Sequence, residues 1–147
     1  MLPDRTKLHH TPPPWVPDAS LYFITICCRD RRRNSLALLK IATPLLETVA
    51  HRESLLQWNV HLMLFMPDHL HAFITFAPHQ AMTKTLSDWK QYTAKKLKID
   101  WQSNYFDHRL RNQAEIDEKW DYVLQNPVRA KLCNSPEDWP YKRIGRA

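Results

Sequence analysis

The sequence contains a single glycine, Gly145, among its 147 residues. Loops that wrap around the phosphates of a nucleotide need several glycines, so a P-loop and a dinucleotide-binding fingerprint are both excluded. Cysteine is also scarce: there are three, and none of them forms a CxxC pair. This odd count argues against a disulfide framework and against a zinc ribbon. We expect the three thiols to be small apolar core groups.

Long apolar runs are missing too. No stretch approaches the roughly 20 residues that cross a bilayer, and the Pro-rich, charged N-terminus lacks the apolar core of a signal peptide. We therefore expect a cytoplasmic protein, associated with the nucleoid. The length fits one domain over residues 21–147, preceded by a Pro-rich arm over residues 1–20. The net charge of +6 favours an anionic partner, with nucleic acid first.

The stretch from Met66 to Phe76 organises the rest of the chain, and we expect it to be a β-strand entered through a tight turn. Side chains alternate between the two faces of a strand. The even-numbered residues 70–76 form a wholly apolar face that should pack on the core. His69 and His71 point together to the other face, where two imidazoles can hold a metal ion. A hydrogen-bonded pair is the commoner role of an isolated His-x-His.

Periodicity predicts the remaining elements. Strands are expected over residues 21–28, 56–65 and 101–108, and helices over residues 43–54, 81–98 and 113–125. Thr43 should cap the first helix with Pro44 at its first position, and Pro127 should end the last one. The tail should form a short helical turn and an aromatic clasp. This order predicts an α+β fold, the ferredoxin-like β-α-β-β-α-β antiparallel sheet with an added C-terminal helix on the histidine face.

The register of the second strand against the third has two alternatives. A three-residue turn over residues 66–68 pairs Phe65 with His69 and Met63 with His71, so that the even-numbered residues 58–64 face the core. A two-residue turn places residues 62 and 64 beside the histidines and residues 59 and 61 in the core. We expect the three-residue turn, because a one-residue slip inverts both faces and would bury polar residues.

The last helix can complete a site on the histidine face. Tyr122 lies away from the apolar side of this helix, and Asn126 follows one turn later on the same face. A phenol and an amide oxygen aimed at two histidines would form a nucleophile beside a three-ligand divalent site. The alternative for Tyr122 is an amphipathic residue at the rim of the core.

Four blocks of the sequence, in order, carry a resemblance to a known family. Residues 67–71 (PDHLH) resemble the HUH motif of single-tyrosine DNA nucleases. Residues 101–112 (WQSNYFDHRLRN), 121–130 (DYVLQNPVRA) and 138–141 (DWPY) resemble blocks of the REP-associated tyrosine transposases, members of the HUH-type superfamily. The resemblance covers nearly the whole chain from Tyr22 onward. The chain departs from the family at Lys131, where Gly is frequent, and at Lys142, where Ser is frequent.

The resemblance implies a metal-dependent transposase and nuclease of single-stranded DNA. His69, His71 and Asn126 would hold Mg²⁺ or Mn²⁺. Tyr122 would attack a phosphodiester beside a REP-like hairpin and form a 5′-phosphotyrosine, and rejoining would reverse the step. Tyr92 is a rival nucleophile, on a helix expected to cover the opposite sheet face. The basic residues expected to meet DNA phosphates are Arg31, Arg32, Arg33, Arg109, Arg111, Arg129 and Lys131.

Two other functions are compatible with these residues. A domesticated copy would bind hairpin DNA without cleaving it, and a metal-dependent hydrolase would use the histidines without the tyrosine. The connection before the last helix is short, so this helix can fold back within one chain. We therefore expect a monomer rather than a homodimer that exchanges helices.

Overall fold

The computed structural model describes residues 20–145 of the chain. The predicted arm therefore lies outside the described residues, apart from its last position. The strands are β1 (Leu21–Cys27), β2 (Trp58–Phe65), β3 (His69–Phe76), β4 (Phe106–Leu110) and β5 (Lys142–Ile144). The helices are α1 (Leu39–Ser54), α2 (Met82–Leu97) and α3 (Gln113–Arg129), with a 3₁₀ turn, η1 (Pro136–Asp138), near the end. None of these described helices is both long and apolar enough to cross a membrane.

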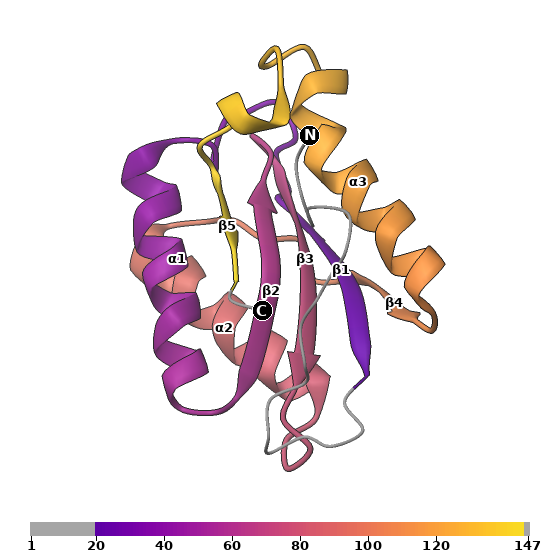
Figure 1. Ribbon diagram of the computed structural model, residues 1–147. Coiled ribbons are helices and arrows are strands. Elements are labelled where there is room, and N and C mark those ends of the chain that lie inside the picture. The colour runs from indigo at the N-terminus through magenta and orange to yellow at the C-terminus, as the bar shows by residue number, and fades with distance from the viewer. Residues whose placement is uncertain (1–19, 146–147) are drawn as a thin grey trace.

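The five strands form one antiparallel sheet in the order β4-β1-β3-β2-β5 (Figure 1). The predicted ferredoxin-like arrangement is confirmed, because β3 lies in the centre next to β1. Helices α1 and α2 cover one face of the sheet, and α3 crosses the other face (Figure 1). The sheet is therefore the middle of three layers.

Each face of β3 packs in its own core. The predicted apolar face, residues 70, 72, 74 and 76, packs with α1 and α2, where Trp58 and Trp89 meet at a centroid distance of 5.8 Å. Phe73 on the opposite face contacts Trp120 of α3 at 5.1 Å. His69 and His71 share the face of Phe73, so the histidines lie on the α3 side as predicted.

The predicted register of β2 is wrong over its second half. Leu64, not Met63, pairs with His71. The strands are joined by a two-residue turn that is closed by a hydrogen bond from Met66 N to His69 O (2.8 Å). A β-bulge at residue 61 inserts one residue and reverses the alternation beyond it.

The bulge explains why neither predicted register holds along the whole strand. Before it, Trp58 and Val60 face the α1–α2 core as expected. After it, residues 62 and 64 belong to the α3 core, and residues 63 and 65 belong to the α1–α2 core. Because this half of β2 is apolar on both faces, either alternation buries only apolar side chains, and the hydrophobic pattern carries no sign of the switch.

Both predicted proline boundaries are wrong. Helix α1 begins at Leu39 with Leu38 as its N-cap, so Thr43 and Pro44 lie inside it. Helix α3 continues through the buried Pro127 and ends at Arg129. Pro127 lies in the last turn of α3, close to the helix end, where burial of its ring outweighs one lost hydrogen bond.

Strand β4 also differs from its prediction, because it begins at Phe106 rather than at residue 101. Trp101 makes only an isolated bridge to Cys28. The indole of Trp101 instead points into the α1–α2 core, where Nε1 donates to the buried hydroxyl of Thr93 (3.0 Å). Residues 99–105 are therefore a crossing segment between α2 and the edge of the sheet.

The tail forms the predicted helical turn and aromatic clasp. The Trp139 and Tyr141 rings meet at 5.0 Å, and Trp139 Nε1 donates to Phe65 O (2.9 Å). The tail then adds β5, an edge strand that the sequence pattern did not predict. Gly145 N donates to His61 O (2.8 Å), and a Cβ atom on Gly145 would collide with the backbone beside the bulge. The single glycine thus stands where two backbones come too close for a side chain.

Candidate active site

The two histidines form the centre of the site. The ring centroids of His69 and His71 lie 4.9 Å apart. In each ring Nδ1 already has a partner: the Thr25 hydroxyl for His71 (2.8 Å) and an Asp68 carboxylate oxygen for His69 (2.7 Å). A partner on Nδ1 fixes the ring and leaves Nε2 for a ligand, which is the usual arrangement around protein metal sites. Sequence reasoning missed Thr25, because it is distant in sequence, and passed over Asp68 although it stands inside the PDHLH block.

The environment keeps His71 neutral. Burial, together with the nearby positive groups of His69, Lys119 and Arg129, lowers the pKa of His71 to about 3. The Phe23 ring stacks on the imidazole at 5.4 Å with an interplanar angle of 20°. The neutral form of imidazole is the one that binds a metal, so His71 offers a ligand lone pair at physiological pH.

Asp68 links His69 to the basic loop that follows β1. Its second carboxylate oxygen accepts a hydrogen bond from Arg31 Nε (2.8 Å). Burial raises the pKa of Asp68, but the hydrogen bonds from Arg31 and His69 outweigh it and hold the pKa below its ordinary value. Asp68 therefore stays ionised and anchors one arginine of the loop beside the histidine pair. Arg32 instead pairs with Asp30 (3.3 Å) and Arg33 is exposed.

Helix α3 carries Tyr122 and Asn126 one turn apart on the side of the sheet that bears the histidines. Tyr122 is 51% exposed. The Arg129 guanidinium carbon lies 4.0 Å from the centre of the Tyr122 ring. Arg129 Nη2 also donates to Tyr122 O (2.7 Å) and lies 3.4 Å from Asn126 Oδ1. One cation thus touches both candidate side chains.

A second cation connects α3 to the histidines. Lys119 Nζ lies 5.4 Å from the centre of the Phe23 ring and 5.7 Å from the centre of the Tyr122 ring. Because Phe23 stacks on His71, Lys119 stands between the histidine stack and Tyr122. Sequence reasoning did not single out Lys119.

The remaining predicted residues are spread more widely. Tyr92 belongs to α2 on the opposite side of the sheet, is 47% exposed and lines a groove between α1 and α2. Arg109 pairs with Tyr22, whose side chain packs in the α1–α2 core, so Arg109 also faces away from the histidines. Arg111 is exposed just before α3, and Lys131 is exposed just after it.

The structure brings two imidazoles together, and Asn126 lies on the helix that packs over the same face of the sheet. Within residues 20–145, no cluster of three or more His, Cys, Asp and Glu side chains is placed to hold a metal. Burial raises the pKa of the Cys28 thiol to about 11, so it stays protonated and is a poor ligand. The third ligand expected from the sequence, Asn126, is of another residue type and lies on α3.

Comparison with known proteins assigns the family. The family model described as "Transposase IS200 like" matches residues 19–120, more than half of the chain. The chain belongs to this family. The match includes both histidines of this IS200-like transposase and ends two residues before Tyr122, so it does not cover the candidate nucleophile.

Individual relatives agree with the resemblance found in the four sequence blocks. A candidate REP-associated tyrosine transposase of Haemophilus influenzae is 23% identical over 141 residues, which cover 86% of this chain and 80% of the relative. The REP-associated tyrosine transposase of Escherichia coli K12 is 28% identical over 94 residues, which cover 60% of this chain and 56% of the relative. The predicted relationship to the REP-associated tyrosine transposases is confirmed.

A solved structure shares the fold. The structure of a REP-associated tyrosine transposase bound to a REP hairpin matches with a TM-score of 0.73 at 20% identity, over 84% of this chain and 75% of that chain. At 20% identity this likeness bears on the fold alone, and it agrees with the fold described above for this IS200-like transposase. Together with the family model and the named relatives, it supports the predicted enzyme class, a transposase.

Proposed function

We propose that this transposase nicks and rejoins single-stranded DNA beside REP-like hairpins through a 5′-phosphotyrosine intermediate on Tyr122. The observation that carries the proposal is the placement of α3. This helix brings Tyr122 and Asn126 to the sheet face of His69 and His71, whose Nδ1 atoms are held by Asp68 and Thr25. The solved structure with a REP hairpin supports the choice of substrate.

The donor set fits a divalent metal. We assign His69 Nε2, His71 Nε2 and Asn126 Oδ1 as its protein ligands, with Thr25 and Asp68 orienting the two imidazoles. Nitrogen ligands shift the preference from Mg²⁺ toward Mn²⁺. When bound, the ion would polarise the scissile phosphate and stabilise the charge on the leaving 3′-oxygen.

The protein's own groups account for the remaining steps. The Tyr122 oxygen attacks phosphorus and loses its proton to solvent, a phosphotyrosine bond forms, and the bond to the 3′-oxygen breaks. The leaving 3′-oxygen takes up a proton from solvent and becomes a free 3′-hydroxyl. Lys119 and Arg129 each place a positive charge over the Tyr122 ring, and these two charges attract the backbone phosphate. Because the covalent bond to tyrosine conserves the phosphodiester energy, rejoining needs no nucleotide cofactor. The absence of a glycine-rich phosphate loop agrees with this chemistry.

The decisive experiment compares the wild type with Tyr122→Phe. Each protein is incubated with Mn²⁺ and an oligonucleotide that carries a REP-like hairpin, and the covalent protein–DNA adduct is measured on a denaturing gel. We expect an adduct with the wild type, none with Tyr122→Phe, and a normal amount with Tyr92→Phe, the matched control on α2. An adduct that persists in Tyr122→Phe would show that another residue is the nucleophile.

The same assay separates the alternative functions. Hairpin binding without any adduct in the wild type would indicate a DNA-binding protein that does not cleave. Metal-dependent cleavage that survives Tyr122→Phe and leaves no protein–DNA bond would indicate a hydrolase that uses only the histidines.

A further inference from the structure

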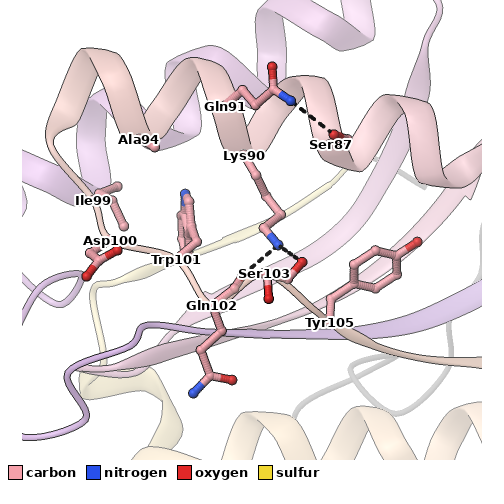
Figure 2. Close-up of a pocket in the computed structure, with 10 residues that line it drawn as sticks. All are labelled: Ser87, Lys90, Gln91, Ala94, Ile99, Asp100, Trp101, Gln102, Ser103 and Tyr105. Atoms are coloured by element: carbon pink, nitrogen blue, oxygen red, sulfur yellow. Dashed lines mark hydrogen bonds between the residues drawn. The ribbon is translucent and has the colours of Figure 1, made fainter.

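A cavity lies outside the candidate active site, between α2 and the crossing segment of residues 99–105 (Figure 2). Its volume is about 310 Å³, which is at the lower end of the range for small-molecule sites. The α2 side includes Lys90 and Gln91, and the crossing segment contributes Trp101 and Tyr105. The cavity is large enough for one planar group and is open on one side.

The cavity has a cationic wall. Figure 2 shows the Lys90 side chain reaching from α2 across to the crossing segment, where Nζ donates to Gln102 O (2.7 Å) and Ser103 O (3.0 Å). An ammonium group has three donors, so one remains for a ligand. Burial lowers the pKa of Lys90, and the neighbouring Arg29 lowers it further. Arg29 lies beside the cavity, where its Nε donates to Trp101 O (3.1 Å) and pairs with Asp100 (3.2 Å), a carboxylate that lines the cavity. Lys90 is therefore the cation that an anionic group would meet inside the cavity.

The cavity also has an aromatic wall. The Tyr105 ring is only partly buried, and Lys90 Nζ lies 5.9 Å from its centre. Trp101, which also lines the cavity, is fixed in place: its indole donates a hydrogen bond to Thr93, and its ring centre lies 5.7 Å from that of Trp89. An aromatic face beside cations is the combination with which proteins bind unpaired bases of single-stranded nucleic acids.

The backbone connects this cavity to the histidine pair. Gln102 N donates to Cys27 O (2.8 Å), and Cys27 is the β1 partner of His69. The crossing segment is therefore separated from His69 by one strand, a distance of about 10 Å at the usual strand spacing. The basic loop over residues 29–34, whose Arg31 is anchored beside His69, leaves β1 between the two places. The cavity lies on the α2 side of the sheet and the histidines on the α3 side, so a DNA strand would reach the cavity from the active site past this basic loop and around the crossing segment.

We propose that this cavity binds one unpaired nucleotide of the DNA strand that passes through the active site, with Tyr105 stacked on the base and Lys90 at its phosphate. The proposal rests on the proposed function, since it takes the substrate strand from there. It assigns to the crossing segment a role in selecting single-stranded DNA that the metal and tyrosine alone do not provide.

The test is a double-mutant cycle between the protein and the DNA. A set of hairpin oligonucleotides carries a single abasic site at each successive position around the cleavage point. We measure the rate of adduct formation and the dissociation constant for the wild type, Tyr105→Ala and the control Tyr92→Ala, which removes an exposed tyrosine from the other side of α2. At one position, the abasic site should weaken DNA binding by the wild type about 10-fold, which is within the range for stacking of one base.

The expected coupling is specific. Tyr105→Ala should weaken binding of the intact oligonucleotide by a similar factor and should then be insensitive to the abasic site at that one position. Tyr92→Ala should behave as the wild type. If the effects of Tyr105→Ala and of every abasic site are simply additive, the cavity does not bind a base and the proposal is wrong.

A second measurement needs no variant. An oligonucleotide with 5-iodouracil at the sensitive position should crosslink to a peptide that contains Tyr105, and a crosslink only to peptides of α3 would overturn the assignment. Both measurements also separate this proposal from the proposed function. If the wild type forms no adduct but shows the coupling in binding, the cavity proposal is supported and the proposed catalysis is wrong. If adduct formation is normal and the effects are additive, the proposed catalysis is supported and the cavity proposal is wrong.

Discussion

The central carbon of the Arg129 guanidinium lies over the Tyr122 ring, 4.0 Å from its centre, and Nη2 donates to the Tyr122 carbonyl oxygen at 2.7 Å. The same Nη2 lies 3.4 Å from Asn126 Oδ1. Planar guanidinium groups stack on aromatic rings in a way that an ammonium cannot copy. Arg129, expected from the sequence to contact DNA phosphate, therefore also positions the candidate nucleophile and its neighbouring amide.

The first prediction separates these two roles of Arg129. Arg129→Lys keeps the charge but loses the planar stack and the hydrogen bond to the Tyr122 carbonyl. We expect adduct formation about 10-fold slower, because small displacements of a reacting group are costly, with hairpin affinity within about 2-fold of the wild type. Single-turnover adduct rates and binding isotherms measure both quantities. Arg111→Lys, at an exposed arginine, is the control. A wild-type adduct rate in Arg129→Lys would mean that Arg129 contributes only its charge.

The second prediction concerns the orientation of His71. Thr25→Val keeps the size of the side chain but removes the hydroxyl that pairs with His71 Nδ1 (2.8 Å). Loss of such a partner typically lowers metal affinity 10- to 100-fold, and we expect at least about 10-fold weaker Mn²⁺ binding in a calorimetric titration. Thr83→Val, at an exposed position of α2, should leave the affinity unchanged. Equal affinities for the two variants would mean that the Thr25 hydroxyl does not orient the ligand.

The third prediction is the pH dependence of stability in the metal-free protein. The pKa of His71 is about 3 in the folded chain and 6.5 in the unfolded one. Between these values only the unfolded chain takes up the proton, so stability falls as the pH drops below 6.5. From pH 7 to pH 5 this group should lower the free energy of unfolding by about 2 kcal/mol.

Urea unfolding at both pH values, with a chelator present, measures this loss. His71→Gln should lose less stability than the wild type by about that 2 kcal/mol. His79→Gln, at an exposed histidine, should lose as much as the wild type. If His71→Gln retains the full pH dependence, then His71 is protonated in the folded chain.

The fourth prediction concerns the end of α3. Lys131 has a φ of 62°, the left-handed conformation that favours glycine. The hydrogen bonds from Lys131 N to Val128 O and from Leu132 N to Pro127 O, both 2.9 Å, form a Schellman motif around it. Lys131→Gly should therefore stabilise the protein by about 1 kcal/mol, measured by urea unfolding. Ala130→Gly, where φ is −80°, should give no gain, and a destabilised Lys131→Gly would contradict this account.

The fourth prediction also explains one departure from the family pattern. The family frequently has Gly at the position of Lys131, and the structure gives the physical reason, because the helix ends there in a left-handed residue. A lysine at this position accepts some backbone strain and gains a charge near the last turn of α3. The departure affects the local turn and leaves the placement of Tyr122 intact.

Local pattern was enough to predict much of this protein. The alternation from His69 to Phe76 placed both histidines on one face and an apolar surface on the other, because successive side chains of a strand point in opposite directions. The four-residue spacing of Tyr122 and Asn126 placed them one helical turn apart for an equally local reason. The order of the elements, together with the apolar and histidine faces of β3, predicted the sheet arrangement and the side of the sheet on which α3 packs.

Features that depend on contacts between distant residues were decided only by the tertiary structure. The bulge at His61 leaves no trace in a strand that is apolar on both faces, and β5 forms because the aromatic clasp of the tail brings residues 142–144 against the edge of β2. The Thr25–His71 and Arg129–Tyr122 contacts likewise join groups whose pairing no periodicity encodes. The sequence by itself determined which residue types could form the site and which face they share. The tertiary structure decided which neighbours orient them, because hydrogen bonds and ring stacking require distances that only the folded chain brings about.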